Sequence, residues 1–336
     1  MASVTGWEPD VLPGYWQQPL ALGADPDGEG DLVATLISRG EPPRNDRRPE
    51  RAVLLVHGYT DYFFHTELAD HFAARGFACY ALDLPKCGRS RRDGQTPHFT
   101  SNLAHYDGAL EAALEAIGAA DVLMYGHSAG GLIVSLWLDR LRRRSATGPI
   151  SGLVLNSPFF DLHGPAILRT PPTSAALIAL ARFRRMQVVR KPTTGGYGTT
   201  LHRDFAGEFD YNLDWKPVGG FPVTFGWINA IRRGQKRLHR GLDVGVPSLI
   251  LRSDRSVTEA GDPALIQRGD AVLDVSQIAR WAGCVGDRLT VVPITDAKHD
   301  VFLSVAEPKA TAYHELDTWL DWYLKTGTSS TTPHSG

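Results

Sequence analysis

The segment YGHSAGG at residues 125–131 places one serine, Ser128, between two glycines, Gly126 and Gly130. Residues 121–126 read as a short buried strand, and the apolar side chains of residues 131–141 recur at helical spacing. A serine between a strand and a helix in this pattern has a strained backbone that lifts its hydroxyl above the sheet edge, at a helix N-terminus. The pattern therefore predicts a nucleophile rather than a serine that only caps the helix.

A serine hydroxyl is a weak nucleophile, so a base must take its proton and a third group must hold that base. The chain has 12 histidines, and His299 is the candidate favoured by its position. It follows the strand-like residues 289–294 by a short loop and precedes the last predicted helix, which places it at the same sheet edge as Ser128. His57 also follows a strand, but we expect it to brace its loop.

Acyl transfer also needs donors for the developing oxyanion. The loop LLVHGYTDY (residues 54–62) leaves a core strand at Gly58, so the backbone N–H of Tyr59 is one predicted donor. The N–H of Ala129, directly after the serine, is the other. Neither role depends on the side chain.

The elements that must position these groups alternate along the chain. Strands are predicted at residues 30–38, 52–58, 77–84, 121–126, 152–157, 246–253 and 289–294, with helices at 67–75, 102–117, 132–143, 276–283 and 308–324. Short connections between strands and helices predict an α/β fold, with a mostly parallel central sheet and helices on both faces. The opening before residue 30 reads as irregular.

Residues 159–245 interrupt this alternation, with a single convincing helix at 174–185. We expect residues 1–158 and 246–326 to form the core, 159–245 an inserted cap, and 327–336 a disordered tail. Because the insertion begins at the carboxyl end of a core strand, its aromatic residues could line a pocket over Ser128. Phe159, Trp215 and Trp227 are the candidates, although each could instead belong to the insertion's own core.

The composition narrows the classes of function. With 43% hydrophobic and 21% charged residues the chain is typical of globular proteins, and its net charge of −2 gives no reason to expect a nucleic-acid partner. Three scattered cysteines make neither a disulfide framework nor a metal site. No signal peptide, membrane-spanning segment, phosphate loop or zinc-ligand spacing is visible. We expect a cytoplasmic protein with no metal and no cofactor, and leave its oligomeric state open.

Four motifs together resemble the α/β-hydrolases, and within them the monoacylglycerol lipase, lysophospholipase and serine aminopeptidase group. They are LLVHGYTDY, DLPKCGRS (residues 83–90), GHSAGG (126–131) and AKHDVFLS (297–304). The resemblance implies the α/β-hydrolase fold and the chain order Ser, Asp, His for a catalytic triad. One departure is Lys86, which stands where the second motif of the family has its first glycine.

Two aspartates compete for the acid of that triad. Asp254 comes directly off the strand that precedes the histidine strand, where this fold keeps its acid. Asp270 lies after the unusual segment TEAGDPALIQRG (residues 258–269), and with Asp274 as a helix cap it matches the acid loop of the family. We favour Asp270 because this match covers more residues, and because Arg252 and Arg255, which flank Asp254, suggest an ion pair there instead.

These residues predict a serine hydrolase of carboxylic esters that acts through an acyl-enzyme. The resemblance implies small or lipid-like esters of the monoacylglycerol or lysophospholipid kind. The alternatives are a peptidase or amidase, for which Glu208, Asp210 and Asp214 could anchor a free amine, and a lactonase or thioesterase. A ligand-binding protein on the same scaffold would lack part of the triad.

Overall fold

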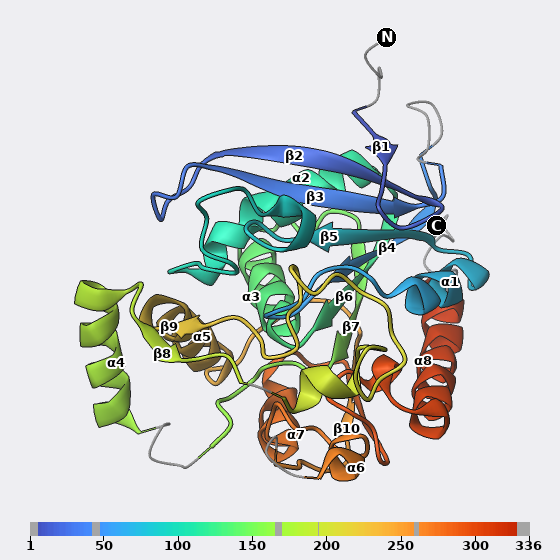
Figure 1. Ribbon diagram of the computed structural model, residues 1–336. Helices are drawn as coiled ribbons and strands as arrows, with labels where there is room; N and C mark the ends of the chain where they lie inside the picture. Colours follow the sequence, from blue (N-terminus) through green and yellow to red (C-terminus); the bar gives the residue numbers. More distant parts are fainter. Residues whose placement is uncertain (1–5, 42–47, 165–169, 194, 259–261, 328–336) are drawn as a thin grey trace.

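The computed structural model describes residues 6–41, 48–164, 170–193, 195–258 and 262–327 (Figure 1). Within them a nine-stranded sheet has the order β1-β2-β3-β5-β4-β6-β7-β10-β11. The strands of this sheet are β1 (Glu8–Pro9), β2 (Tyr15–Ala24), β3 (Asp31–Arg39), β4 (Arg51–Val56), β5 (Ala78–Asp83), β6 (Asp121–His127), β7 (Ile150–Asn156), β10 (Ser248–Ser253) and β11 (Leu289–Ile294).

Neighbouring strands in the series β5-β4-β6-β7-β10-β11 pair in parallel. Strands β1, β2 and β3 join them at β5 as an antiparallel edge. The predicted mostly parallel sheet is thereby confirmed. The predicted irregular opening is wrong, because β2 pairs with β3 along most of its length. Its sequence, YWQQPLALGA, carries polar residues and a proline and is only partly buried, so its apolar pattern is weak.

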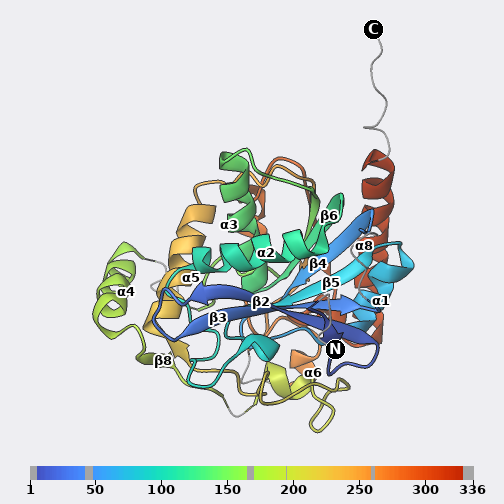
Figure 2. The ribbon, with the colours of Figure 1, turned by 90° about the horizontal axis from the view of Figure 1, so that it is seen from above.

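Helices cover both faces of the sheet, as predicted (Figures 1 and 2). The helices of the described residues are α1 (Thr66–Ala74), α2 (Asp107–Ile117), α3 (Ala129–Arg143), α4 (Pro171–Arg184), α5 (Phe225–Leu238), α6 (Pro263–Ile266), α7 (Val275–Trp281) and α8 (Ala306–Gly327). Of these, α4 packs against α5 and lies apart from the nine-stranded sheet. Strand β4 explains the two layers, since its side chains alternate. Val53 and Leu55 pack in one core with α1 and α8, whereas Leu54 and Val56 pack in the other with α2 and α3.

The segment between β7 and β10 holds α4, the short antiparallel pair β8 (Val188–Arg190) and β9 (Val223–Thr224), and α5. The prediction of a single helix in this segment is wrong. Trp227, Ala230, Ile231 and Leu238 recur at helical spacing on α5 and pack into the core on the α3 side of the sheet. The hydroxyl of Thr224 caps α5 by accepting a hydrogen bond from the amide of Trp227 at 3.3 Å.

In the described part of the chain, no helix combines the length and the apolar character needed to cross a membrane. The predicted disordered tail begins at residue 327, which is the last residue of α8, and residues 328–336 lie outside the described residues.

Candidate active site

Ser128 occupies a sharp turn between β6 and α3. Its backbone has φ 51° and ψ −117°, a conformation that non-glycine residues rarely adopt. The turn is held by the Ser128 amide, which donates to the carbonyl of Asn156 at 3.0 Å. The hydroxyl makes no capping hydrogen bond to α3. Helix α3 starts directly after the serine, three residues earlier than predicted, so its N-terminus lies at the turn.

The glycines around Ser128 are required by close backbone approaches. A Cβ on Gly126 would lie 2.7 Å from the Cα of Gly131, and a Cβ on Gly130 would lie 2.3 Å from the carbonyl oxygen of His57. A larger residue at position 126 would push the start of α3 away from β6, and one at position 130 would push it away from the end of β4. The sequence GHSAGG therefore fixes this turn through packing against the neighbouring loop.

His299 and Asp270 meet in the structure. Nδ1 of His299 donates to Oδ2 of Asp270 at 2.9 Å, and both side chains are buried. The other carboxylate oxygen of Asp270 accepts from the amides of Val272 and Leu273, each at 2.8 Å. Together the three donors hold the carboxylate of Asp270 in one orientation. His299 then carries its proton on Nδ1, which leaves Nε2 free to accept one.

The chain returns to the end of β10 at Asp270. Ser256 and Asp270 form a parallel bridge, the Asp270 amide donates to the carbonyl of Arg255 at 3.0 Å, and the Val257 amide donates to that of Asp270 at 2.9 Å. The inserted segment thus leaves and rejoins the fold at one place. Counting from the end of β10 leads to Asp254, and counting back from α7 leads to Asp270. The inserted segment between them explains why the two counts give different aspartates.

Asp254 lies elsewhere and has other partners. Its carboxylate pairs with Arg255 at 3.2 Å and accepts from the amide of Asp296 at 3.0 Å. The side chain is 28% exposed. Asp254 thus ties the loop after β10 to the loop after β11, and no hydrogen bond joins it to His299 in the described residues.

The two donors predicted for an oxyanion are the backbone amides of Tyr59 and Ala129. Neither amide has an acceptor within the described part of the chain. The loop that carries Tyr59 is braced by His57, whose Nε2 accepts from the amide of Leu84 at 3.0 Å while Nδ1 donates to the carbonyl of Gly58 at 2.8 Å. Both nitrogens of His57 are therefore occupied.

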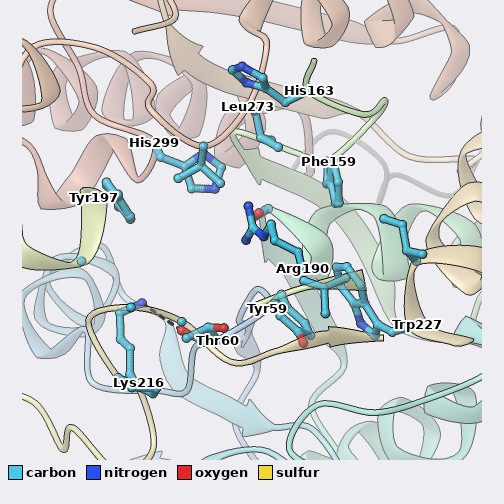
Figure 3. Close-up of a pocket in the computed structure, with 18 of the residues that line it drawn as sticks. Tyr59, Thr60, Phe159, His163, Arg190, Tyr197, Lys216, Trp227, Leu273 and His299 are labelled. Carbon is cyan, nitrogen blue, oxygen red and sulfur yellow. Dashed lines mark hydrogen bonds between the residues drawn. The ribbon is translucent and has the colours of Figure 1, made fainter. Parts of the chain in front are cut away.

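A cavity of about 500 Å³ contains Ser128 and His299 in its wall (Figure 3). Phe159 and Trp227 line it, together with Tyr59, whose ring centroid lies 4.0 Å from that of Trp227. Trp215 does not line it, contrary to expectation. Its ring packs edge-on against Tyr62, with a centroid separation of 5.1 Å.

No carboxylate lines this cavity among the described residues, whereas Arg190, Lys216 and His163 do. The carboxylates considered for binding a free amine lie outside it. Asp210 pairs with Arg203 at 2.9 Å, and Glu208 lies 3.7 Å from Lys309. Asp214 is also absent from the wall.

A buried charged cluster that the sequence reasoning missed lies beside the cavity. Lys216 Nζ contacts Asp61 Oδ1 at 2.7 Å, His127 Nδ1 lies 3.4 Å from Asp61 Oδ2, and His127 Nε2 lies 3.9 Å from Asp300 Oδ2. Burial acts to raise the pKa of Asp61, but Lys216 and His127 outweigh it and hold that pKa well below its usual range. The ring of His127 is 4.9 Å from that of His299. Asp61, His127 and Asp300 lie within three of the four motifs, and this was the one signal in the sequence that could have indicated the cluster.

Lys86 adopts the left-handed conformation, with φ 64°, that glycine favours at this position of the family motif. Its side chain is buried, and Nζ contacts Asp25 at 2.6 Å and Glu29 at 2.8 Å. The two carboxylates anchor the loop to the β2–β3 hairpin. In the described residues no group of His, Cys, Asp or Glu is arranged to hold a metal ion.

Comparisons with known proteins show the family and the fold of the chain. The family model described as "Serine aminopeptidase, S33" matches residues 47–271, about two thirds of the chain. No match is found among the curated proteins.

Solved structures of similar fold include lipases and an esterase. A soluble variant of monoglyceride lipase from Saccharomyces cerevisiae, in complex with a substrate analog, is 18% identical over 90% of this chain and 94% of its own, with a TM-score of 0.61. The monoacylglycerol lipase of Paleococcus ferrophilus is 18% identical over 82% of this chain and 96% of its own, with a TM-score of 0.60. The esterase RhEst1 from Rhodococcus sp. ECU1013 is 18% identical over 90% and 98%, with a TM-score of 0.50. At such identities the likeness concerns the fold alone.

Proposed function

This chain belongs to the serine aminopeptidase (S33) family and has the α/β-hydrolase fold, and on this premise we propose that it is a serine hydrolase of carboxylic esters. In this proposal Ser128 is the nucleophile, His299 the general base and Asp270 the acid. The observation that carries it is the hydrogen bond from His299 Nδ1 to the buried Asp270, with His299 and Ser128 in the wall of one cavity.

The reaction follows from these positions. Ser128 Oγ attacks the acyl carbon while His299 Nε2 takes its proton, and Asp270 stabilises the imidazolium that forms. The amides of Tyr59 and Ala129 donate to the oxyanion, at the N-terminus of α3. His299 then gives the proton to the leaving alcohol. Water, deprotonated by the same nitrogen, releases the acid from the acyl-enzyme and restores the serine.

An ester is favoured over a peptide with a free amino terminus by the charge of the cavity. A bound ammonium group would need a carboxylate partner, and none lines the cavity in the described residues. The aromatic and aliphatic wall suits an acyl chain or an aryl group. Monoacylglycerol-like and lysophospholipid-like esters are therefore the proposed class, and the lipases of similar fold support it.

We further propose that residues 159–245 act as a cap on a core made of residues 1–158 and 246–326. Phe159, Arg190, Lys216 and Trp227 all come from this segment and line the cavity. The cap would then select the substrate, while the core would supply the reacting groups.

The test is hydrolysis of 4-nitrophenyl esters from acetate to palmitate by the wild type and by Ser128→Ala. The proposal expects turnover by the wild type, with a chain-length optimum set by the cavity, and none above background by the variant. Equal turnover by the two proteins would refute the role of Ser128. A wild type that is inert on every ester would refute the ester class.

A further inference from the structure

Arg190 is a cation in the cavity wall for which the described residues supply no carboxylate partner. Lys216 also lines the cavity, but its ammonium contacts the buried carboxylate of Asp61 at 2.7 Å. Among the described residues no carboxylate pairs with Arg190, which lies on β8 opposite Val223. Two cations therefore face the cavity, and one of them is available to a ligand.

The side chain of Arg190 extends into the cavity. Figure 3 shows it reaching from its strand toward the space between His299 and Tyr59. The hydroxyl of Tyr59 is held by the carbonyl of Pro222 at 2.7 Å. Burial raises the pKa of Tyr59, while the nearby charge of Arg190 acts to lower it. The guanidinium thus lies among the groups that a substrate must touch.

From this arrangement we propose that the preferred substrate is an anionic ester, whose carboxylate or phosphate group binds Arg190. This inference rests on the proposed ester hydrolysis and names its substrate class. The planar guanidinium donates two parallel hydrogen bonds to a carboxylate or phosphate, which makes it selective for such groups.

The proposal also explains how a neutral ester would be disfavoured. Arg190 is exposed, so water solvates its charge while the cavity is empty. A ligand that fills the apolar cavity displaces part of this water. An anionic ester replaces it with charged hydrogen bonds, whereas a neutral ester leaves the guanidinium without a partner.

The kinetic test uses two pairs of esters that differ in one charge. The acyl pair is 4-nitrophenyl octanoate and the mono-4-nitrophenyl ester of suberic acid. The alcohol pair is 4-nitrophenyl butyrate and 3-carboxy-4-nitrophenyl butyrate. For one pair we expect the ratio of kcat/KM, anionic over neutral, to fall about tenfold in Arg190→Gln, equivalent to about 1.4 kcal/mol. The pair that responds identifies the side of the ester that carries the anion.

Three comparisons make this result specific. Arg190→Lys keeps the charge and should retain part of the preference. Arg184→Gln removes an exposed arginine of α4 that does not line the cavity, and should leave the ratio unchanged. Turnover of the neutral esters should rise in Arg190→Gln, because the cavity then holds no guanidinium that a neutral ester leaves without a partner. The same ratio in wild type and Arg190→Gln for both pairs would overturn the proposal.

A binding measurement separates this proposal from the hydrolysis itself. Calorimetric titration of Ser128→Ala with monomethyl suberate and dimethyl suberate reads recognition without turnover. We expect tighter binding of the monoanion, and loss of the difference when Arg190→Gln is added. If the wild type hydrolyses no ester, the proposed function fails, and the titration still tests whether Arg190 binds the anionic group. Equal affinities for these two esters, together with equal affinities for phenyl butyrate and 3-carboxyphenyl butyrate, would refute the role of Arg190.

Discussion

Replacing Asp270 with asparagine changes one atom at the centre of the site. One carboxylate oxygen accepts from the amides of Val272 and Leu273, and the other faces His299 Nδ1. In Asp270→Asn the amide oxygen keeps the two backbone donors, so the NH2 group must face His299. A donor there requires Nδ1 to accept, and the proton of the imidazole moves to Nε2. His299 can then no longer take the proton of Ser128.

The loss should be large in kcat and small in stability. We expect kcat to fall on the order of 10⁴-fold, the cost of the corresponding substitution in serine protease triads, equivalent to about 5.4 kcal/mol. Both backbone donors stay satisfied, so the free energy of unfolding should fall by only about 1–2 kcal/mol. The assay is 4-nitrophenyl butyrate hydrolysis, with urea denaturation to report folding.

Asp254→Asn is the matched control, because this aspartate was the rival candidate for the acid. Its carboxylate is partly exposed and paired with Arg255, so its loss should cost about 1 kcal/mol of stability at most. Its kcat should stay within about threefold of the wild type, because no proton position at His299 changes. A folded Asp270→Asn that keeps a tenth of the wild-type kcat, or a greater loss in Asp254→Asn, would refute the reasoning.

Two further predictions concern packing and pH. Gly130→Ala would force a Cβ against the His57 carbonyl and should lower the free energy of unfolding by about 2–3 kcal/mol, whereas Gly108→Ala, in open space on α2, should raise it by about 0.5–1 kcal/mol. Urea denaturation compares them, and equal effects would contradict the packing argument. Burial lowers the pKa of Lys298 to about 8 from 10.5, so the unfolded chain binds the extra proton between these values. Stability relative to Lys298→Met should therefore rise by about 3 kcal/mol from pH 8 to pH 10.5, and a flat difference in urea titrations would contradict it.

The parts of the fold that could be predicted are those that depend on patterns among neighbouring residues, such as apolar runs and the spacing of glycines. The apolar run of β4 is buried on both faces and was recognised as a core strand. The glycines around Ser128 indicated a tight turn. A Cβ on either of them would clash with backbone atoms of the same motif or of the adjoining loop. Helix α5 was missed although Trp227, Ala230 and Ile231 have helical spacing, because glycines and basic residues interrupt the apolar pattern.

The remaining features depend on contacts between residues distant in sequence. The bridge between Ser256 and Asp270 returns the chain to the end of β10, and no pattern in the neighbouring sequence predicts it. The pairing of Lys216 with Asp61 joins the segment 159–245 to the loop after β4. Trp215 is an aromatic of that same segment, yet it packs on Tyr62 rather than on the cavity, since composition alone does not say which way a ring points.

The role of Ser128 as nucleophile is tested most directly by mass spectrometry after reaction with a fluorophosphonate. A strained serine that lines the same cavity as its proposed base should form one covalent adduct in the wild type, and digestion should place it on the peptide that contains Ser128. Ser128→Ala should carry no adduct, and Asp270→Asn should react far more slowly. Absence of an adduct in folded wild-type protein, or an adduct on another residue, would contradict the account.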